Sequence, residues 1–378
     1  MKIVYIINQL NLFGGVERII ADKANALAEE YGHEVTIICL CQKEGVGNAY
    51  PCSPLVKQIN LGLEKFEFPA LPREKPFMYI YAILRWYYRC LHRVRTVLRG
   101  IKPDITIVPT QVGRPGVYFR TYSIIESHMY FPKKKLRWRH VLNWGPLEYA
   151  TRRCKALITL THHEVSHWDK ARRVEVIPNF TNIKPIAPCN VGAKRAMAAG
   201  RLTDQKGFDL LIDAWRIVKQ QHPDWQLDIY GEGSEKNRLM QQIETNELAD
   251  AVLLHQPTKE IAREYAVHSM FILSSRSEGF PLVLLEAITC GMPCVAFDCP
   301  TGPAEMIDHE MNGILVPFEN LPREEQVSGL AAAICRMMEK TDEERAQMGK
   351  AAMEKAKLFG KDVIMARWDK LFHEVAGK

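Results

Sequence analysis

Two glutamates stand eight positions apart in the stretch SEGFPLVLLEA, residues 277 to 287, on either side of a Gly-Phe-Pro turn. The apolar residues around Glu278 and Glu286 should be buried, whereas carboxylates resist burial unless they have partners. Pro281 fits the first position of a helix, where its missing N–H costs nothing. Glu278 is therefore expected on a loop and Glu286 on the helix that follows it. Carboxylates accept hydrogen bonds from hydroxyl groups, so the pair indicates a ligand that contains sugar.

Two cations stand close to a second turn, in AAGRLTDQKGFDLL, residues 198 to 211. A β-rich run ends at Gly200, Arg201 and Lys206 follow, and a helical pattern begins near Phe208. Cations beside a helix N-terminus suit a diphosphate, because the side chains and the backbone N–H groups both attract anions. The alternative is that both cations are solvated loop charges.

Glycine turns follow two further β-rich runs. QLNLFGGVER, residues 9 to 18, carries Gly15, and IYGEGSEKNRL, residues 229 to 239, carries Gly231. Glycine allows the backbone to approach a ligand closely at the start of a helix. Neither turn is the G-x-G-x-x-G of dinucleotide-binding units, so a nicotinamide oxidoreductase is disfavoured.

The elements that position these residues alternate between β-rich runs and helical patterns, which predicts parallel sheets covered by helices. At 378 residues the chain is too long for one ordinary core. We expect an α/β fold of two Rossmann-like, doubly wound domains that face each other across a cleft, with ligands at the carboxyl ends of the strands. The expected strands are 3–7, 35–40, 105–108, 120–125, 156–159, 195–199, 226–230, 252–255, 270–274, 293–297 and 313–316.

The break between the domains should fall in residues 179–192, which are rich in Pro and Asn and lack periodicity. This gives an N-terminal domain of residues 1–182 and a C-terminal domain of residues 183–360. Residues 361–378 form a helix that is expected to pack back on the N-terminal domain.

Charge is distributed unevenly along a chain whose net charge is +6. Residues 71–140 hold 15 basic and 3 acidic side chains, which implies an anionic partner. Residues 76–100 predict an amphipathic helix with arginines four apart from Arg85, and residues 131–140 add a second basic cluster. The helix suits an anionic membrane surface, or else its apolar face packs on its own domain. Nucleic-acid binding is not expected, because no recognised fingerprint accompanies the charge.

The location of the protein follows from its apolar runs and its cysteines. No run approaches the roughly 20 apolar residues of a spanning helix, and the N-terminal run is too short for a secretory signal. The ten cysteines show no zinc-ligand spacing and are interpreted as reduced thiols. We expect a cytoplasmic protein, with peripheral attachment to the inner face of the plasma membrane as a hypothesis.

In combination, these motifs resemble the retaining glycosyltransferases of family 4. The resemblance centres on Glu278-x7-Glu286 within EGFPLVLLEAITCGMPCVA. The other matching segments, in the family's order, are FGGVER (13–18), IIESH (124–128), VIPN (176–179), AAGRLTDQKG (198–207), YGEG (230–233), CPTGPAEMI (299–307) and NGILV (312–316). The family has the GT-B fold, so the resemblance implies an acceptor-binding N-terminal domain and a C-terminal domain that binds the nucleotide-sugar donor.

The resemblance also implies roles for residues around the glutamate pair. Glu286 would accept hydrogen bonds from the ribose hydroxyls of the donor. Glu278, with the backbone of Gly279, Phe280 and Leu282, would hold the transferred sugar and the diphosphate.

Residues of the other turns receive roles in the same way. Arg201 and Lys206 would neutralise the diphosphate as it leaves. Gly15 and Gly231 would let the backbone approach the donor. His128, which ends the IIESH segment, resembles the histidine that these enzymes place near the transferred sugar.

The implied activity is that of a hexosyltransferase, which moves a hexose or N-acetylhexosamine with retention to a saccharide or lipid-linked saccharide in surface-polysaccharide synthesis. The CPTGPAE form resembles enzymes that use UDP-sugars. The sequence has no Asp-x-Asp, which agrees with catalysis without a metal, and no cofactor is expected. One departure is VLLHQPT, residues 252–258, where family members often carry a glycine and this chain has His255. The alternatives are a sugar-nucleotide epimerase of the same fold and a noncatalytic protein that binds an anionic surface.

Overall fold

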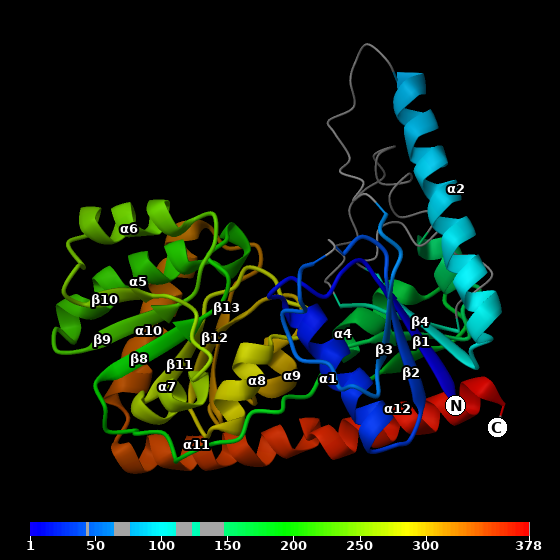
Figure 1. Ribbon diagram of the computed structural model, residues 1–378. Helices are drawn as coiled ribbons and strands as arrows, with labels where there is room; N and C mark the ends of the chain where they lie inside the picture. Colours follow the sequence, from blue (N-terminus) through cyan, green and yellow to red (C-terminus); the bar gives the residue numbers. More distant parts are fainter. Residues whose placement is uncertain (43–44, 64–75, 111–122, 129–146, 378) are drawn as a thin grey trace. The chain divides into compact units, whose positions relative to one another are not determined.

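The chain forms two compact units in the computed structural model (Figure 1). Unit 1 comprises Met1–Ile177 with Ile364–Lys378, and unit 2 comprises Pro178–Val363. The sequence analysis had placed these divisions after residues 182 and 360. The residues that the structure describes are 1–42, 45–63, 76–110, 123–128 and 147–377. The basic cluster at 131–140 lies outside them.

Unit 1 is built on a parallel sheet with the strand order β3-β2-β1-β4-β5-β6-β7. Its strands are β1 (Lys2–Ile7), β2 (Glu34–Cys39), β3 (Lys57–Asn60), β4 (Ile105–Pro109), β5 (Ile124–Glu126), β6 (Ala156–Thr159) and β7 (Val174–Val176). Its helices are α1 (Gly15–Glu29), α2 (Pro76–Ile101), α4 (His162–Val165), the 3-10 turn Ser166–Trp168, and the part of α12 (Lys361–Ala376) from Ile364 onward. The central strands are near-continuous apolar runs, as expected for parallel strands that helices cover on both faces.

Most strands of unit 1 lie where the sequence predicts them, with three exceptions. The strand expected at 120–125 is β5, which runs from Ile124 to Glu126; residues 120–122 lie outside the described part of the chain. The strands β3 and β7 were not predicted. Both are short edge strands with partly exposed residues throughout, so they show neither a buried apolar run nor a clear alternation.

The basic helix predicted at residues 76–100 is confirmed as α2. Its apolar face contributes Val94 and Leu98 to the interior of unit 1. Nearer its start, Tyr81 and Tyr88 are 64% and 71% exposed. No helix among the described residues is long and apolar enough to cross a membrane.

Unit 2 repeats the same winding in a second parallel sheet, with the order β10-β9-β8-β11-β12-β13. Its strands are β8 (Arg195–Ala199), β9 (Gln226–Tyr230), β10 (Val252–His255), β11 (Met270–Leu273), β12 (Cys294–Asp298) and β13 (Gly313–Pro317). Its helices are α5 (Phe208–Gln221), α6 (Lys236–Thr245), α7 (Ile261–Val267), α8 (Leu282–Thr289), α9 (Pro303–Met306), α10 (Arg323–Glu339) and α11 (Asp342–Ala356), with 3-10 turns at Asp204–Lys206 and Lys357–Phe359. Each of these strands lies within one residue of its prediction.

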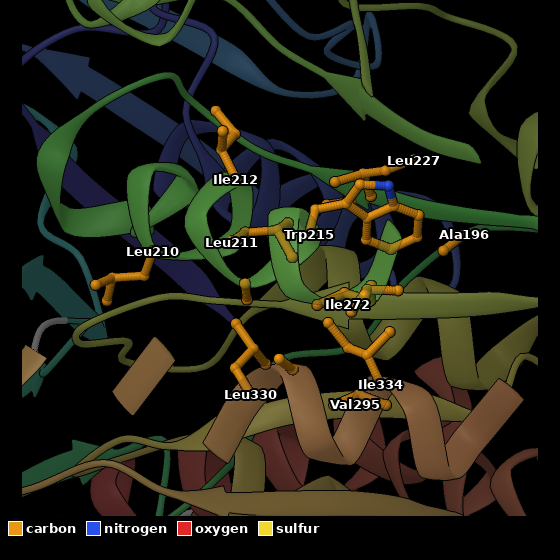
Figure 2. Close-up of a cluster of buried hydrophobic side chains, with 14 of the residues drawn as sticks. Ala196, Leu210, Leu211, Ile212, Trp215, Leu227, Ile272, Val295, Leu330 and Ile334 are labelled. Atoms are coloured by element: carbon orange, nitrogen blue, oxygen red, sulfur yellow. The ribbon is translucent and has the colours of Figure 1, made fainter. Parts of the chain in front are cut away.

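One face of the second sheet is covered by α5 and α10. The helical pattern predicted from Phe208 onward is confirmed as α5, in which Leu211 and Trp215 are fully buried. Figure 2 shows them gathered with Ile272 of β11 and with Leu330 and Ile334 of α10. This core fixes α5, and with it the loop that enters α5 from β8.

In each sheet the direction in which strands are added reverses next to the first strand of the unit, between β1 and β4 in unit 1 and between β8 and β11 in unit 2. Open α/β sheets bind ligands at such a point, outside the carboxyl ends of the strands. In unit 2 the loops at this point are residues 200–207 and 274–281. These loops carry Lys206 and Glu278.

Candidate active site

The carboxylate of Glu278 meets the ammonium group of Lys206 at the switch point of unit 2. Lys206 Nζ lies 2.7 Å from Glu278 Oε1. Glu278 is buried and Lys206 is half-buried. The sequence analysis named both residues but did not pair them with each other.

The two loops are also in close contact, and side-chain-to-backbone hydrogen bonds join them. Gly207 has φ +64°, and a Cβ at this position would lie 2.0 Å from the Ser274 carbonyl oxygen. The Ser274 hydroxyl donates to the Lys206 carbonyl at 3.0 Å, and the Gln205 amide donates to the Ser277 carbonyl at 2.8 Å. Glycine at 207 therefore permits the close contact that brings Lys206 to Glu278.

An arginine-carboxylate network, which the sequence analysis missed, supports these loops. Arg276 donates two hydrogen bonds of 2.8 Å to Asp209 at the start of α5, and Arg323 donates a third of 2.7 Å. Burial by itself would raise the pKa of Asp209, but the two guanidinium groups hold it at about 2. The carboxylate is therefore ionised at neutral pH and ties the second loop to α5.

The Gly-Phe-Pro turn before α8 presents backbone donors. The sequence predicts Pro281 as the first residue of the helix. In the structure Pro281 is the N-cap, and the helix begins one residue later, at Leu282. Among the described residues, the backbone N–H groups of Gly279, Phe280 and Leu282 have no hydrogen-bond acceptor. The Phe280 ring packs edge-on against Phe359, with 5.4 Å between ring centroids. The Phe280 ring is therefore engaged in packing, whereas its backbone N–H remains available.

The carboxylate of Glu286 is buried inside unit 2, among apolar residues of α8. Its side chain is 2% exposed, and Glu286 Oε2 accepts a hydrogen bond of 3.2 Å from the Tyr265 hydroxyl. Leu284, Leu285 and Ile288 are buried as predicted. Tyr265 of α7, which no motif indicated, is thus a direct partner of the second glutamate.

Arg201 belongs to the first loop, and Gly231 packs against that loop. A Cβ at Gly231 would lie 2.0 Å from the Gly200 carbonyl oxygen. Packing between the two turns is therefore one reason for glycine at 231. Arg201 is exposed, and its side chain makes no ion pair or hydrogen bond within the described part of the chain.

His255, which stands where family members often carry a glycine, is held by two contacts of its ring. The ring stacks on Tyr230 at 4.7 Å between centroids, and Nε2 lies 2.5 Å from Asp228 Oδ1. Asp228 also accepts hydrogen bonds from Arg195 and His268. A buried carboxylate with three cationic or imidazole partners therefore fixes the orientation of His255.

The predicted residues of unit 1 are Gly15 and His128. Gly15 is exposed and is the first residue of α1. His128 is buried, and its Nε2 lies 2.7 Å from Glu126 Oε2. The same oxygen accepts from the buried Lys23 of α1 at 2.5 Å.

The sequence analysis missed Glu126 and Lys23, although each left a signal. Glu126 stands two positions before His128 at the end of a strand, and alternate residues of a strand share a face. Lys23 lies among buried positions of α1 such as Ile20 and Leu27, where a lysine needs a partner.

Comparison with known families and proteins identifies the fold and the general activity. The family model for Glycosyltransferase Family 4 matches residues 13–184, and the model for glycosyl transferases group 1 matches residues 179–355. HepE of Anabaena, crystallised in complex with UDP, aligns over 99% of this chain and 100% of its own, with a TM-score of 0.72 and 16% identity. The chain is a GT-B glycosyltransferase.

Two curated relatives extend the comparison of this glycosyltransferase. An uncharacterized glycosyltransferase of Haemophilus influenzae is 28% identical over 343 residues, which are 87% of this chain and 89% of that protein. The amylovoran biosynthesis glycosyltransferase AmsD of Erwinia amylovora is 30% identical over 227 residues, which are 57% of this chain and 62% of AmsD. The two parallel sheets of this chain and the alignment with HepE confirm the predicted α/β fold of the GT-B type.

Proposed function

We propose that this GT-B glycosyltransferase is a retaining hexosyltransferase of family 4, which transfers a hexose or N-acetylhexosamine from a UDP-sugar. The observation that carries the proposal is the Lys206–Glu278 pair at the switch point of unit 2. It places a cation and a carboxylate side by side at the edge of the sheet where a doubly wound domain binds its ligand. A diphosphate joined to a sugar needs both groups.

The donor is held along the second loop and α8. Glu278 binds hydroxyls of the transferred sugar, and the N–H groups of Gly279, Phe280 and Leu282 receive the diphosphate at the positive end of the helix. Glu286 binds the ribose hydroxyls, with its carboxylate oriented by the Tyr265 hydroxyl. This assignment requires Glu286 to exchange or share its buried contacts when the nucleotide enters.

The leaving diphosphate is stabilised by side-chain cations. Lys206 shifts its attraction from Glu278 to the phosphate oxygens as negative charge develops, and Arg201 is free to add a second cation. Gly15 gives the acceptor and the donor phosphate access to the start of α1, and His128 contacts the transferred sugar. Cationic side chains in this role, with no Asp-x-Asp in the sequence, favour catalysis without a metal or cofactor.

The nucleotide and the acceptor are assigned from the related proteins and from one sequence segment. The complex of HepE with UDP and the CPTGPAE segment favour UDP. The relationship to an amylovoran biosynthesis enzyme favours a saccharide or lipid-linked saccharide acceptor in surface-polysaccharide synthesis. Unit 1 is proposed to bind that acceptor, and unit 2 the donor.

The binding test is calorimetry with a panel of UDP- and GDP-sugars in a metal-free buffer. The proposal predicts saturable binding of a UDP-sugar, and transfer with retention seen by NMR of the product. Absence of binding for every nucleotide sugar contradicts the proposed function. Binding that requires added divalent metal contradicts only its metal-independent part.

Two variants separate donor binding from turnover. Glu286→Gln should weaken nucleotide binding, because an amide accepts fewer hydroxyl hydrogen bonds than a carboxylate. Lys206→Ala should lower kcat by about 10²–10³-fold with a smaller effect on binding, because its contact strengthens in the transition state. The matched controls are Glu244→Gln and Lys350→Ala, which change exposed helical residues of unit 2. Unchanged kinetics in both site variants would reject the site assignment.

Peripheral attachment to an anionic membrane through α2 completes the proposal. Arg85 and Arg89 are exposed beside the exposed rings of Tyr81 and Tyr88, which is the composition of an interfacial helix. The wild-type protein should bind vesicles that contain phosphatidylserine and release them at high salt.

The variant for this test reverses two charges of α2. Arg85→Glu with Arg89→Glu should abolish vesicle binding, whereas Arg216→Glu with Lys350→Glu, which changes the net charge equally in unit 2, should retain it. Arg93 is left in place because its guanidinium donates to the Leu61 carbonyl. If the wild type does not bind, or if both double variants lose binding equally, α2 is not the attachment site.

A further inference from the structure

A buried chain of three polar side chains ends at His128. Lys23 Nζ and His128 Nε2 both contact the same oxygen of Glu126, at 2.5 and 2.7 Å. The side chains of all three residues are at most 2% exposed. Lys23 reaches this point from α1, and its ammonium group lies 4.4 Å from the ring centroid of Trp368 in α12.

The geometry determines which nitrogen of His128 carries the proton. Glu126 Oε2 is an acceptor when the carboxylate is ionised, so Nε2 of the neutral ring must be the donor. Nδ1 is then unprotonated and can accept a hydrogen bond. A carboxylate that orients a histidine in this manner also fixes the direction of the ring.

Lys23 keeps Glu126 in the ionised state that this tautomer needs. Burial alone would raise the pKa of Glu126, but Lys23 and His128 together hold it at about 2. Without Lys23 a buried carboxyl group tends to take up a proton. Its O–H could then donate to Nε2, which would move the ring proton to Nδ1 and reverse the polarity of the free edge.

The remaining charged and titratable groups around the ring agree with a neutral imidazole. Burial lowers the pKa of His128, Glu126 offsets this in part, and Lys23 lowers it further. Tyr5 of β1 faces Glu126, and burial followed by that carboxylate raises its pKa, so it stays neutral. The ring therefore carries no positive charge of its own, and the ionised carboxylate of Glu126 lies between it and the Lys23 ammonium group.

On the opposite face of residues 126–128, the Ser127 side chain contacts a second buried carboxyl group, that of Glu164. The hydroxyl of Ser127 hydrogen-bonds to Glu164 of α4, and Glu164 Oε2 also accepts from the Leu160 N–H at 3.4 Å. Burial, offset only in part by these bonds, raises the pKa of Glu164 to about 8, so this carboxyl group is mostly neutral at pH 7. The segment 126–128 thus has an ionised carboxylate on the face of His128 and a neutral carboxyl on the opposite face.

We propose that Glu126, backed by Lys23, is a positioning residue that keeps His128 as the Nε2–H tautomer and presents Nδ1 as an acceptor to a hydroxyl of the sugar substrate. The contact with sugar rests on the proposed function. The tautomer does not, because it follows from the contacts of Lys23, Glu126 and His128 alone.

The first experiment reads the tautomer in the intact wild-type protein. Nitrogen NMR of protein labelled in its histidine rings distinguishes the two neutral tautomers and the imidazolium ion, and a His128→Asn variant assigns the signal among the 12 histidines. The expected result at pH 7 is a neutral ring protonated at Nε2. A ring protonated at Nδ1, or at both nitrogens, overturns the proposal whether or not a glycosyl donor is known.

The second experiment changes the acceptor. In Glu126→Gln the amide group can donate to Nε2, which should shift the signal toward the Nδ1–H tautomer and lower kcat by about 10–100-fold while the KM for the donor changes little. Because this variant leaves Lys23 buried without a counter-charge, Glu126→Gln combined with Lys23→Met is made in parallel and checked by circular dichroism. Glu148→Gln, an exposed glutamate of unit 1, is the matched control.

A double-mutant cycle separates positioning from a structural role. In a His128→Ala background, Glu126→Gln should change kcat by less than about twofold, because the residue through which it acts is gone. If the losses of the two single variants multiply instead, Glu126 does not act through His128. If the wild-type tautomer is as expected but no nucleotide sugar binds, the positioning holds and the proposed function fails.

Discussion

Replacing Asp209 with asparagine should weaken unit 2 and loosen the two loops that carry Lys206 and Glu278. Asp209 is 4% exposed. Its arginine partner Arg276 donates its backbone N–H to the Gln205 carbonyl at 2.8 Å, so it joins both loops. The asparagine amide would also direct N–H donors at guanidinium groups that have no acceptor to offer in return.

The size of the effect follows from the pKa of Asp209. This pKa is about 2 in the folded chain, because the arginines outweigh burial, against an ordinary value of 3.8. One pKa unit corresponds to 1.36 kcal/mol, so the ionised group contributes about 2 kcal/mol to the free energy of unfolding at pH 7. Because the folded pKa is the lower one, the contribution is present above the unfolded pKa and is lost as the pH falls through about 2. About half of it should remain near pH 3.

The assay is denaturant unfolding followed by tryptophan fluorescence at pH 7 and near pH 3, together with calorimetry of the donor nucleotide. Asp209→Asn should lose about 2 kcal/mol at pH 7, about half of that near pH 3, and bind the nucleotide more weakly. The control is Asp224→Asn, which removes an exposed partner of Lys194 and should have no measurable effect. Equal midpoints for the wild type and Asp209→Asn at pH 7, or a loss independent of pH, would show that the network does not hold the loops.

Four further substitutions test packing, protonation and ligand binding in the two units. Gly231→Ala should destabilise unit 2 by about 1–3 kcal/mol, because the added Cβ would lie 2.0 Å from a carbonyl oxygen. Gly100→Ala, at a helical position with open space around it, should stabilise unit 1 by about 0.5–1 kcal/mol. Equal shifts of the melting temperature in the two variants would contradict the clash at Gly231. The wild type should lose stability relative to Glu164→Gln as the pH rises from about 4.5 through about 8, because the folded chain favours the protonated Glu164 carboxyl group. A difference in melting temperature that does not depend on pH would argue against a raised pKa of Glu164. Tyr265→Phe removes the hydroxyl bonded to Glu286 and should weaken nucleotide binding with kcat preserved; a lower kcat at unchanged affinity would assign the hydroxyl another role.

The secondary structure of unit 2 could be read almost entirely from its sequence, because its strands are short apolar runs bounded by glycine turns. The same reasoning missed β3 and β7 of unit 1. Edge strands have one free side and partly exposed residues, so the local pattern does not separate them from loops. The helix α5 was predictable because Leu211 and Trp215 repeat on one side of a helix.

The residues of the candidate active site were named from the sequence, since glycine turns, paired glutamates and loop cations are local patterns. Their partners were not. Lys206 and Glu278 are separated by 72 positions, and Lys23 and Glu126 by 103. Lys206 and Glu278 meet because β8 lies beside β11. Lys23 and Glu126 meet because β1, which leads into α1, and β5 belong to the same sheet with β4 between them.

Strand order is a property of the whole sheet. Local propensity states that a strand forms, but the burial of both sheet faces and the packing of crossover helices decide which strands are neighbours. The stretch SEGFPLVLLEA by itself predicts that the carboxylate of Glu278 is directed at a sugar. Only the tertiary structure decides that Glu278 contacts Lys206 from another loop. The two residues meet because β8 and β11 are neighbours in the sheet, so that the loops at their carboxyl ends lie together.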